Sequence, residues 1–244
     1  MDKGHIALLF SLALSAAFDT IDQQILISRL TSRIGVRGVA LQWFTSYLAD
    51  WSTKVEINGK SSLSSMSSVG LPQGSVFGPI GYTIYTLPVG DIARRHQVFY
   101  HTYADDIQLY ITFDPKKTSS QDAALKTLSA CVADIRAWMS LNKLKLNEDK
   151  TEFLVIGSVH NLRRLENVIL NVGATSSIPS KSARNLGAYF DCNMSMSEQE
   201  IHLCKSDRFH LRSISKIRKC MTEDACHSAV RCHILSRLDY YTVF

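Results

Sequence analysis

Two neighbouring acids, Asp105 and Asp106, lie within an otherwise apolar and aromatic stretch, VFYHTYADDIQLYITF at 98–113. Residues 107–113 alternate apolar and polar side chains, so this stretch predicts a β-hairpin with both acids at its bend. At a bend the two carboxylates can approach one point, where they repel each other unless a cation lies between them. Mg²⁺ prefers carboxylate oxygens and substrate phosphates as ligands. The pair therefore predicts either a divalent-cation site or an ordinary solvated turn, in which Asp is common.

A second set of candidate residues is basic and lies near the C-terminal end. Residues 201–219 contain six basic residues and one acid, so this segment carries a net charge of +5, equal to that of the whole chain. Such a concentration predicts a phosphate-facing surface or, alternatively, a solvated helix face. The six residues are Lys205, Arg208, Arg212, Lys216, Arg218 and Lys219.

The six cysteines contain no C-x-x-C pair and are typical of free thiols in an intracellular protein. Cys226-His227 and Cys232-His233 offer zinc-ligand types, but their spacing matches no ordinary zinc finger. We therefore interpret these cysteines as small buried apolar residues.

The elements that must position the acids and bases follow from hydrophobic periodicity. Helices are expected at 24–30, 39–49 and 81–87, at 119–142 with Ser119-x-x-Asp122 as its N-terminal cap, and from 198 onward. Further strands are expected at 54–58, 152–156 and 186–190, with a serine-rich loop at 61–68. The chain is 45% hydrophobic and 20% charged, which are ordinary globular values. This order predicts an α+β domain with an antiparallel sheet, followed by a small basic helical unit.

The first apolar run, residues 6–14, fits either a buried strand or the hydrophobic region of a secretory signal peptide. Ser15-Ala16-Ala17 could pass for a cleavage site, but Asp2 cancels the charge of Lys3 in the preceding region. No apolar stretch has the roughly 20 residues that a membrane span needs.

Six segments resemble, in order, the motifs of reverse transcriptases. LSAAFDTID at 14–22 is similar to the first palm motif, LPQGSVFGP at 71–79 to the loop-and-helix motif, and YADD at 103–106 to the metal-binding motif. NKLKLNEDKTEFLVIG at 142–157 resembles the motif behind the active site, and RNLGAYFD at 184–191 resembles the primer grip. Residues 211–240 are similar to the thumb of jockey-like non-LTR (LINE-type) retrotransposon polymerases.

This resemblance implies a polymerase palm, with an antiparallel sheet packed on helices, at 1–180. The primer-grip region would be 181–198, and a partial helical thumb would occupy 199–244. The first apolar run would then be a palm strand rather than a signal peptide, in a protein of the nucleus or cytoplasm. Because the chain begins about a dozen residues before the first palm motif, the fingers are expected to be missing from this fragment.

The resemblance also implies roles for single residues. Asp105 and Asp106 would hold two Mg²⁺ ions at the primer end, with Tyr103 beside the substrate. Phe18 would lie under the incoming sugar and exclude a 2′-hydroxyl, unless it is a simple core aromatic. Lys150 would lie near the departing pyrophosphate as a cation or proton donor, or remain a solvated surface lysine.

Two further residues of the substrate site, Gln73 and Gly74, would line the pocket beside the templating base, where glycine permits close backbone approach. The implied partners are an RNA template, a DNA primer and deoxynucleotide triphosphates, with the basic C-terminal residues contacting nucleic acid.

One position departs from the family pattern. The first palm motif normally carries an acid where this chain has Ala13. Two metal ions roughly 3.5–4 Å apart need a bridging anion, and alanine offers none. Asp19 would be roughly 20 Å further along an extended strand. We therefore expect impaired catalysis, with an inactive relic or a nucleic-acid-binding module as the alternative.

Overall fold

A computed structural model describes residues 4–49, 51–66, 69–72, 74–165, 168–172 and 175–241. Its centre is a four-stranded antiparallel sheet in the order β10-β1-β8-β7. The strands are β1 (Ile6–Leu12), β7 (Phe99–Tyr103), β8 (Asp106–Phe113) and β10 (Glu152–Ile156). The first apolar run is thus an inner strand of the sheet, as the resemblance implied, and the predicted hairpin at 98–113 is confirmed.

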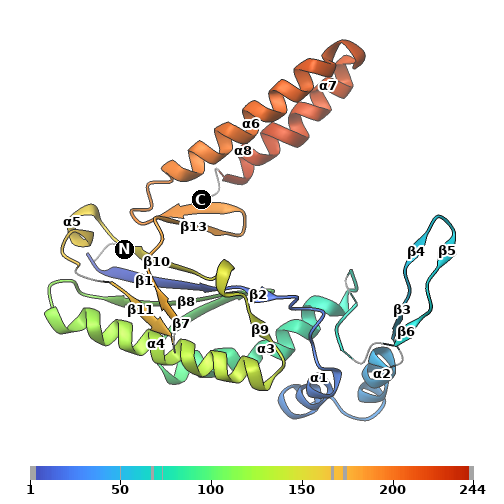
Figure 1. Ribbon diagram of the computed structural model, residues 1–244, viewed down its shortest axis with the longest axis horizontal. Helices are drawn as coiled ribbons and strands as arrows, with labels where there is room; N and C mark the ends of the chain where they lie inside the picture. Colours follow the sequence, from blue (N-terminus) through green and yellow to red (C-terminus); the bar gives the residue numbers. More distant parts are fainter. Residues whose placement is uncertain are drawn as a thin grey trace.

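One face of the sheet carries the core. Alternate residues of β1 are at most 2% exposed (Ile6, Leu8, Phe10 and Leu12), and their cluster includes buried residues of α3 (Phe77–Arg95) and α4 (Thr118–Leu141). Figure 1 shows both helices along the same side of the sheet. The predicted helix at 81–87 is therefore part of a longer one that continues through Pro88.

The helix at 119–142 is confirmed, but its predicted cap is wrong. Helix α4 begins at Thr118, its N-cap residue is Lys117, and no side chain caps it. Ser120 instead donates from its hydroxyl to the carbonyl oxygens of Asp114 and Lys117, which pins the preceding turn.

The two predicted N-terminal helices are also present. Helix α1 (Gln23–Arg29) is followed by a π-helical turn at Leu30–Ile34, and α2 (Gly38–Leu48) begins after Arg37. Asp22 caps α1 by accepting a hydrogen bond from the Ile25 amide at 3.0 Å. The residue after the π-turn, Gly35, has φ +80°, a left-handed conformation that glycine adopts readily.

A thin antiparallel ribbon projects beyond α2 (Figure 1). It pairs β3 (Ser52–Thr53) with β6 (Ser65–Met66), and β4 (Glu56–Ile57) with β5 (Lys60–Ser61). Of the strand predicted at 54–58, only Glu56–Ile57 is paired, and part of the predicted serine-rich loop is the returning half of the ribbon. Ser67 and Ser68 lie outside the described residues.

Three small two-stranded pairings complete the fold of the sheet region. β2 (Leu14–Ser15) pairs with β9 (Lys145–Leu146), and β11 (Leu170–Val172) pairs with β12 (Thr175–Ser177). β13 (Ser182–Asn185) and β14 (Ala188–Asp191) form a hairpin, so the strand predicted at 186–190 begins two residues late, because Leu186 and Gly187 make the turn. Short helical segments lie at Glu148–Lys150 and at α5 (Val159–Leu162).

The β13–β14 hairpin covers part of the other face of the sheet. Ala183 and Phe190 pack against Leu154 and Ile156 of β10 and against Ala7 and Leu9 of β1. This cover includes Ala7 and Leu9 of β1, and the Arg184 amide of β13 donates to Glu152, the β10 residue paired with Ser11.

A helical hairpin follows, as predicted from 198 onward. It consists of α6 (Ser197–Ile217), a 3₁₀ turn at Arg218–Cys220, α7 (Glu223–Val230), a π-helical turn at Arg231–Leu235 and α8 (Ser236–Tyr241). It extends away from the sheet (Figure 1). Cys232 is exposed and Cys226 half-buried, so the expectation that both are buried is wrong. Across the described ranges, no helix is both long and apolar enough to pass through a bilayer.

Candidate polymerase site

The end of the sheet at the β7–β8 turn brings the acid pair beside the first strand. The antiparallel β1–β8 register ends at Leu12 opposite Ile107. The next residue of the first strand, Ala13, therefore lies beside Asp106, the residue before Ile107. Leu12 and Ile107 are both buried, at 1% exposure each. Because side chains alternate between faces, Asp106 and Ala13 lie on the opposite, open face. Ala13 therefore occupies the neighbouring position on the first strand, where a carboxylate would face Asp106.

The turn itself is tight. Ala104 has φ +52°, the left-handed conformation needed to reverse the chain within two residues, and Tyr103 pairs with Asp106 across it. Asp105 is half-buried. Partial burial, and then the neighbouring negative charge of Asp105, raise the pKa of Asp106 above its ordinary value. The two carboxylates thus repel each other.

Tyr82 of α3 is a residue of this site that the sequence did not reveal. It is completely buried, and its hydroxyl is among the few buried polar atoms of the described chain without a hydrogen-bond partner. Burial, followed by the negative charges of Asp105 and Asp106, raises the pKa of this hydroxyl. Its only sequence signal was a polar atom within an apolar helical segment, which is also typical of an ordinary core tyrosine.

Phe18 packs against that tyrosine. The two ring centroids are 4.9 Å apart, at an interplanar angle of 34°. Phe18 is half-buried and belongs to the turn after β2, where Ala16 has φ +49°. Tyr82 thus contacts Phe18, and the charges of both acids act on its hydroxyl. The segments 13–18 and 103–106 therefore lie at the same end of the domain.

The loop before α3 is attached to the same turn. The amides of Gly70 and Leu71 donate to the carbonyl oxygens of Ile21 and Phe18, at 2.7 and 2.9 Å. A β-carbon on Gly70 would lie 3.2 Å from the Asp19 carbonyl oxygen, so this glycine permits a close approach of the two loops.

Of the two residues predicted beside the templating base, Gln73 lies outside the described residues. Gly74 has φ +80°, and a β-carbon there would meet no atom within 4 Å. In the described structure the left-handed backbone of Gly74 favours glycine, and the space beside it stays open to a substrate.

Lys150 and Tyr103 are both exposed. Lys150 ends the 3₁₀ turn after β9, which is held to the first strand by a hydrogen bond from the Asn147 amide to the Ala13 carbonyl oxygen at 2.9 Å. Tyr103 is 62% exposed, on the open face beside Asp106. Both residues are thus available to a substrate, and neither is buried among core side chains.

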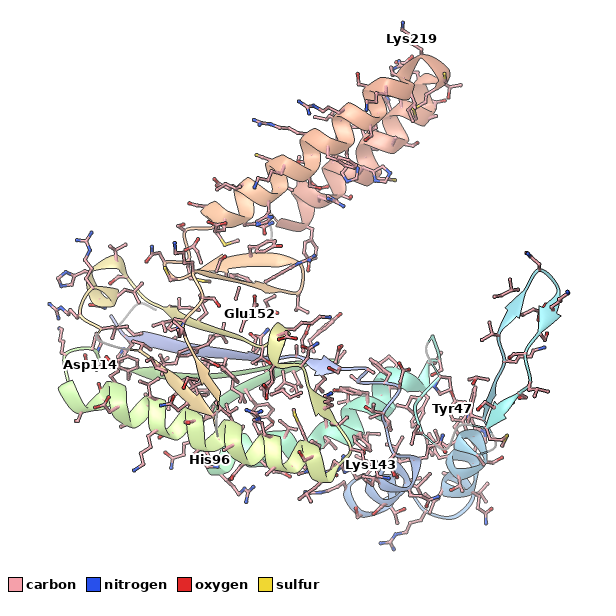
Figure 2. All side chains as sticks on the ribbon, viewed as in Figure 1. Tyr47, His96, Asp114, Lys143, Glu152 and Lys219 are labelled. Atoms are coloured by element: carbon pink, nitrogen blue, oxygen red, sulfur yellow. The ribbon has the colours of Figure 1, made fainter. Side chains whose placement is uncertain are left out.

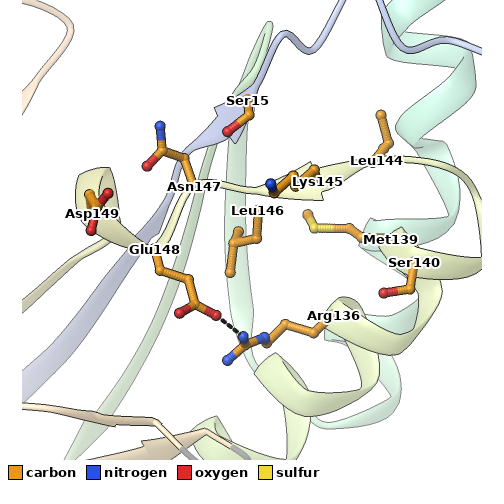
Figure 3. A pocket seen from close by; sticks show the side chains of 10 residues that line it. All are labelled: Ser15, Arg136, Met139, Ser140, Leu144, Lys145, Leu146, Asn147, Glu148 and Asp149. Carbon is orange, nitrogen blue, oxygen red and sulfur yellow. Dashed lines mark hydrogen bonds and ion pairs between the residues drawn. The ribbon is translucent and has the colours of Figure 1, made fainter.

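A separate hollow of about 580 Å³ lies between α4 and β9 (Figure 3). Its lining includes Ser15, Lys145 and an ion pair between Arg136 and Glu148, but neither acid of the β7–β8 turn. This hollow is therefore distinct from the predicted site.

The six basic residues are all exposed on the helical hairpin, away from the acids. Lys205, Arg208, Arg212 and Lys216 follow one another at steps of three and four residues along α6, so they share one face of that helix. Lys219 extends the row into the 3₁₀ turn. Arg218 is off this face and donates to the Met221 carbonyl oxygen at 3.3 Å, which ties the turn.

The acid pair suits one divalent cation better than two. Mg²⁺ is commonly held by one or two carboxylates together with substrate phosphates, and Asp105 with Asp106 meets that requirement. The described residues hold no group of three His, Cys, Asp or Glu side chains able to bind a metal. Ala13, on the neighbouring strand, could not add a further oxygen ligand.

Comparison with known proteins agrees with this geometry. The family model "Reverse transcriptase (RNA-dependent DNA polymerase)" matches residues 2–190. The chain is 32% identical over 111 residues to a probable RNA-directed DNA polymerase from transposon BS of Drosophila melanogaster. The aligned segment covers 43% of this chain and 12% of that protein. The match supports the expected kinship with transposon polymerases.

A solved apo telomerase from Candida tropicalis shares the fold, with a TM-score of 0.52 at 12% identity over 79% of this chain. The chain spans 35% of that telomerase chain. The α+β polymerase fold expected from the motifs is confirmed. A sheet that ends in paired acids, the turn that carries Phe18 and a family match over most of the length lead to one conclusion: this chain belongs to the reverse transcriptase family, whose members are RNA-dependent DNA polymerases.

Proposed function

We propose that this chain is the palm and helical thumb of a non-LTR retrotransposon reverse transcriptase, and that its catalysis is impaired. It would engage an RNA template, a DNA primer and deoxynucleotide triphosphates at the β7–β8 turn. The observation that carries the impairment is the position of Ala13, beside Asp106 on the open face of the sheet.

The remaining residues keep the roles expected of a polymerase site. Asp105 and Asp106 would hold a divalent cation, which would neutralise phosphate charge. Phe18 would contact the incoming sugar, supported by the ring of Tyr82. Exposed Tyr103, at the end of β7, and Lys150, in the 3₁₀ turn after β9, would contact the nucleotide. These roles account for substrate binding but leave the second ion without its bridge.

Primer extension on an RNA template tests this proposal. Ala13→Asp should raise extension by at least about 10–100-fold with Mg²⁺, since loss of even an outer-shell metal partner typically costs that much. Ala13→Asn is the matched control, because it has nearly the same volume as Asp but no charge, and it should not restore extension. Equal extension by the unaltered chain and Ala13→Asp would contradict the proposal.

Metal binding gives a second readout that does not need turnover. Titration with Mn²⁺ should detect tighter binding by Ala13→Asp than by the unaltered chain or Ala13→Asn. In the Ala13→Asp background, Asp105→Asn should weaken Mn²⁺ binding and abolish the restored extension. If Asp105→Asn leaves both unchanged, the acid pair is not the metal site.

An alternative function is nucleic-acid binding without catalysis. The same alanine favours it, because binding of template and primer needs phosphate contacts and not a two-ion site. A chain that binds a primer–template duplex but fails to extend it even as Ala13→Asp would support this alternative.

A further inference from the structure

The basic face of α6 points away from the half of the hairpin that packs against it. The buried residues of α6 are Gln199 and Ile214, and the helix contacts α7 and the π-helical turn at Arg231–Leu235. At 100° per residue, Lys205, Arg212 and Lys216 lie on the opposite side from Ile214. Figure 2 shows nitrogen-tipped side chains along the flank of α6 that is turned away from α7 and α8.

This flank is also turned away from the open end of the sheet. In Figure 1, α7 and α8 lie on the side of α6 nearer to the β3–β6 ribbon, with the β2–β9 end of the sheet below them. The basic row is thus directed outward from the space between the helical hairpin and the ribbon. A duplex lying on the acid pair would first meet α7 and α8.

The row is electrostatically unfavourable in the chain alone. Like charges four residues apart on a helix are destabilising, and this row repeats such a pair twice, at Arg208/Arg212 and Arg212/Lys216. The nearest acid, Asp207, lies on the other side of the helix, and one of its carboxylate oxygens is buried. A polyanion would relieve this repulsion along about 21 Å of helix, from Lys205 to Lys219.

Two exposed rings stand among the cations. Phe209 is 67% exposed and follows Lys205 by one turn. His202 is exposed, lies seven residues before Phe209 and therefore shares its face. His202 stacks on Tyr189 of β14, at 3.9 Å between ring centroids. A single exposed phenylalanine needs no explanation, but rings that alternate with cations are the arrangement that binds unpaired bases and their phosphates.

We propose that the outer face of α6, formed by Lys205, Arg208, Phe209, Arg212 and Lys216, binds single-stranded nucleic acid outside the polymerase site. Phosphates lie along the cations, and a base stacks on the Phe209 ring. A duplex keeps its bases stacked inside and has no base to offer that ring. This binding does not depend on Ala13 or on catalysis.

The test measures fluorescence anisotropy of labelled single strands of about twenty nucleotides, one RNA and one DNA, with chelator present and no primer. The triple variant Lys205→Gln, Arg212→Gln, Lys216→Gln should bind at least about 10-fold more weakly at moderate salt. The slope of log affinity against log salt should fall by about 2, at about 0.7 per lost phosphate contact on a single strand. The matched control neutralises three exposed lysines of the sheet region, Lys116, Lys117 and Lys126, and should bind as the unaltered chain does.

A second variant separates base stacking from charge. Phe209→Ala should weaken single-strand binding by about 10-fold and leave binding of a duplex of the same length unchanged. Its control is Leu211→Ala, which removes an exposed apolar side chain of α6 (50% exposed) from outside the basic face. The RNA and DNA strands decide whether the sugar is recognised, and either preference fits the proposal.

Three results would overturn the proposal. One is equal weakening by the triple variant and its lysine control, because the attraction would then be non-specific. Another is a single strand that binds more weakly than the duplex and whose binding Phe209→Ala leaves unchanged, because no base would then stack on that ring. The third is binding of vesicles with anionic headgroups by the same residues, without binding of single strands, because the face would then be a lipid surface.

Discussion

The acid-bearing end of the sheet and the helical hairpin hold their candidate residues in opposite ways. At the sheet, Asp106 lies on a strand whose inward neighbours, Ile107 and Leu109, are at most 1% exposed. On the hairpin, Ile214 and Ile234 are the buried apolar side chains, at 9% and 7%, and its basic residues follow one exposed helix face. A dense core fixes the first site, whereas local helix geometry alone arranges the second. We therefore expect the two regions to differ in stability.

The largest expected effect tests this difference in cores. Leu109→Ala should lower the free energy of unfolding by about 2–5 kcal/mol, because it leaves a cavity in the central sheet. Ile214→Ala should cost less and act locally, so that hydrogen exchange accelerates in 197–241 while the amides of β1 and β8 stay protected. Equal loss of protection in both regions would show that they unfold as one unit.

A smaller effect is expected at the cap of α1. The hydrogen bond from Lys143, followed by that from the Ile25 amide, lowers the pKa of Asp22, whose side chain is 14% exposed. Asp22→Ala should cost about 1–2 kcal/mol at pH 7. A lowered pKa contributes stability above the ordinary value of about 3.9, and this contribution is lost as pH falls through the lowered pKa. The cost should therefore be smaller at pH 3 than at pH 7.

Chemical denaturation at the two pH values measures this effect. Lys143→Gln removes the ion pair but leaves the cap, so it should cost less than about 1 kcal/mol. A cost that is the same at both pH values would show that the charge of Asp22 contributes nothing.

The attachment of the hairpin gives the next effect. Gln199 is 4% exposed, and its side-chain oxygen accepts a hydrogen bond from the Tyr189 amide at 2.8 Å. Gln199→Ala leaves that amide unpaired and should destabilise the β14–α6 junction by about 1 kcal/mol. Faster exchange of the Tyr189 amide reports it. Glu200→Ala, at the exposed neighbouring position, should leave that exchange unchanged.

The smallest effect has the opposite sign and lies in the acidic site. Burial and the charge of Asp105 raise the pKa of Asp106, so its ionised form opposes folding. Asp106→Asn should therefore stabilise the chain at pH 7, by about 0.5 kcal/mol for an exposed, solvent-screened carboxylate. The gain should disappear below about pH 4, where the unaltered residue binds its proton. Thermal unfolding at both pH values measures it, and destabilisation at pH 7 would contradict the repulsion.

Local sequence patterns were sufficient for the elements and for part of the site. The alternation at 107–113 predicted β8, and the two acids predicted the turn before it. The three- and four-residue steps from Lys205 to Lys216 predicted a basic helix face. Patterns failed where the tertiary environment decides. The cap of α4 is not Ser119, because the chain enters that helix through the turn at Asp114–Lys117. The strand expected at 54–58 is shortened to Glu56–Ile57, because the paired segments of the ribbon at 52–66 are exposed and no core imposes a register.

The sequence by itself determined the family, the acid pair and the absence of a carboxylate at Ala13, because these are properties of residue type and order. Only the tertiary structure decided that Ala13 and Asp106 are neighbours, since strands separated by more than ninety residues meet through the β1–β8 register. The tertiary structure also decided that Tyr82 belongs to the site, because packing brings its hydroxyl close enough for both acids to raise its pKa. The outward direction of the basic row also comes from the tertiary structure, in which Ile214 on the opposite side of α6 is buried. Periodicity defines a helix face but not the element that packs against it.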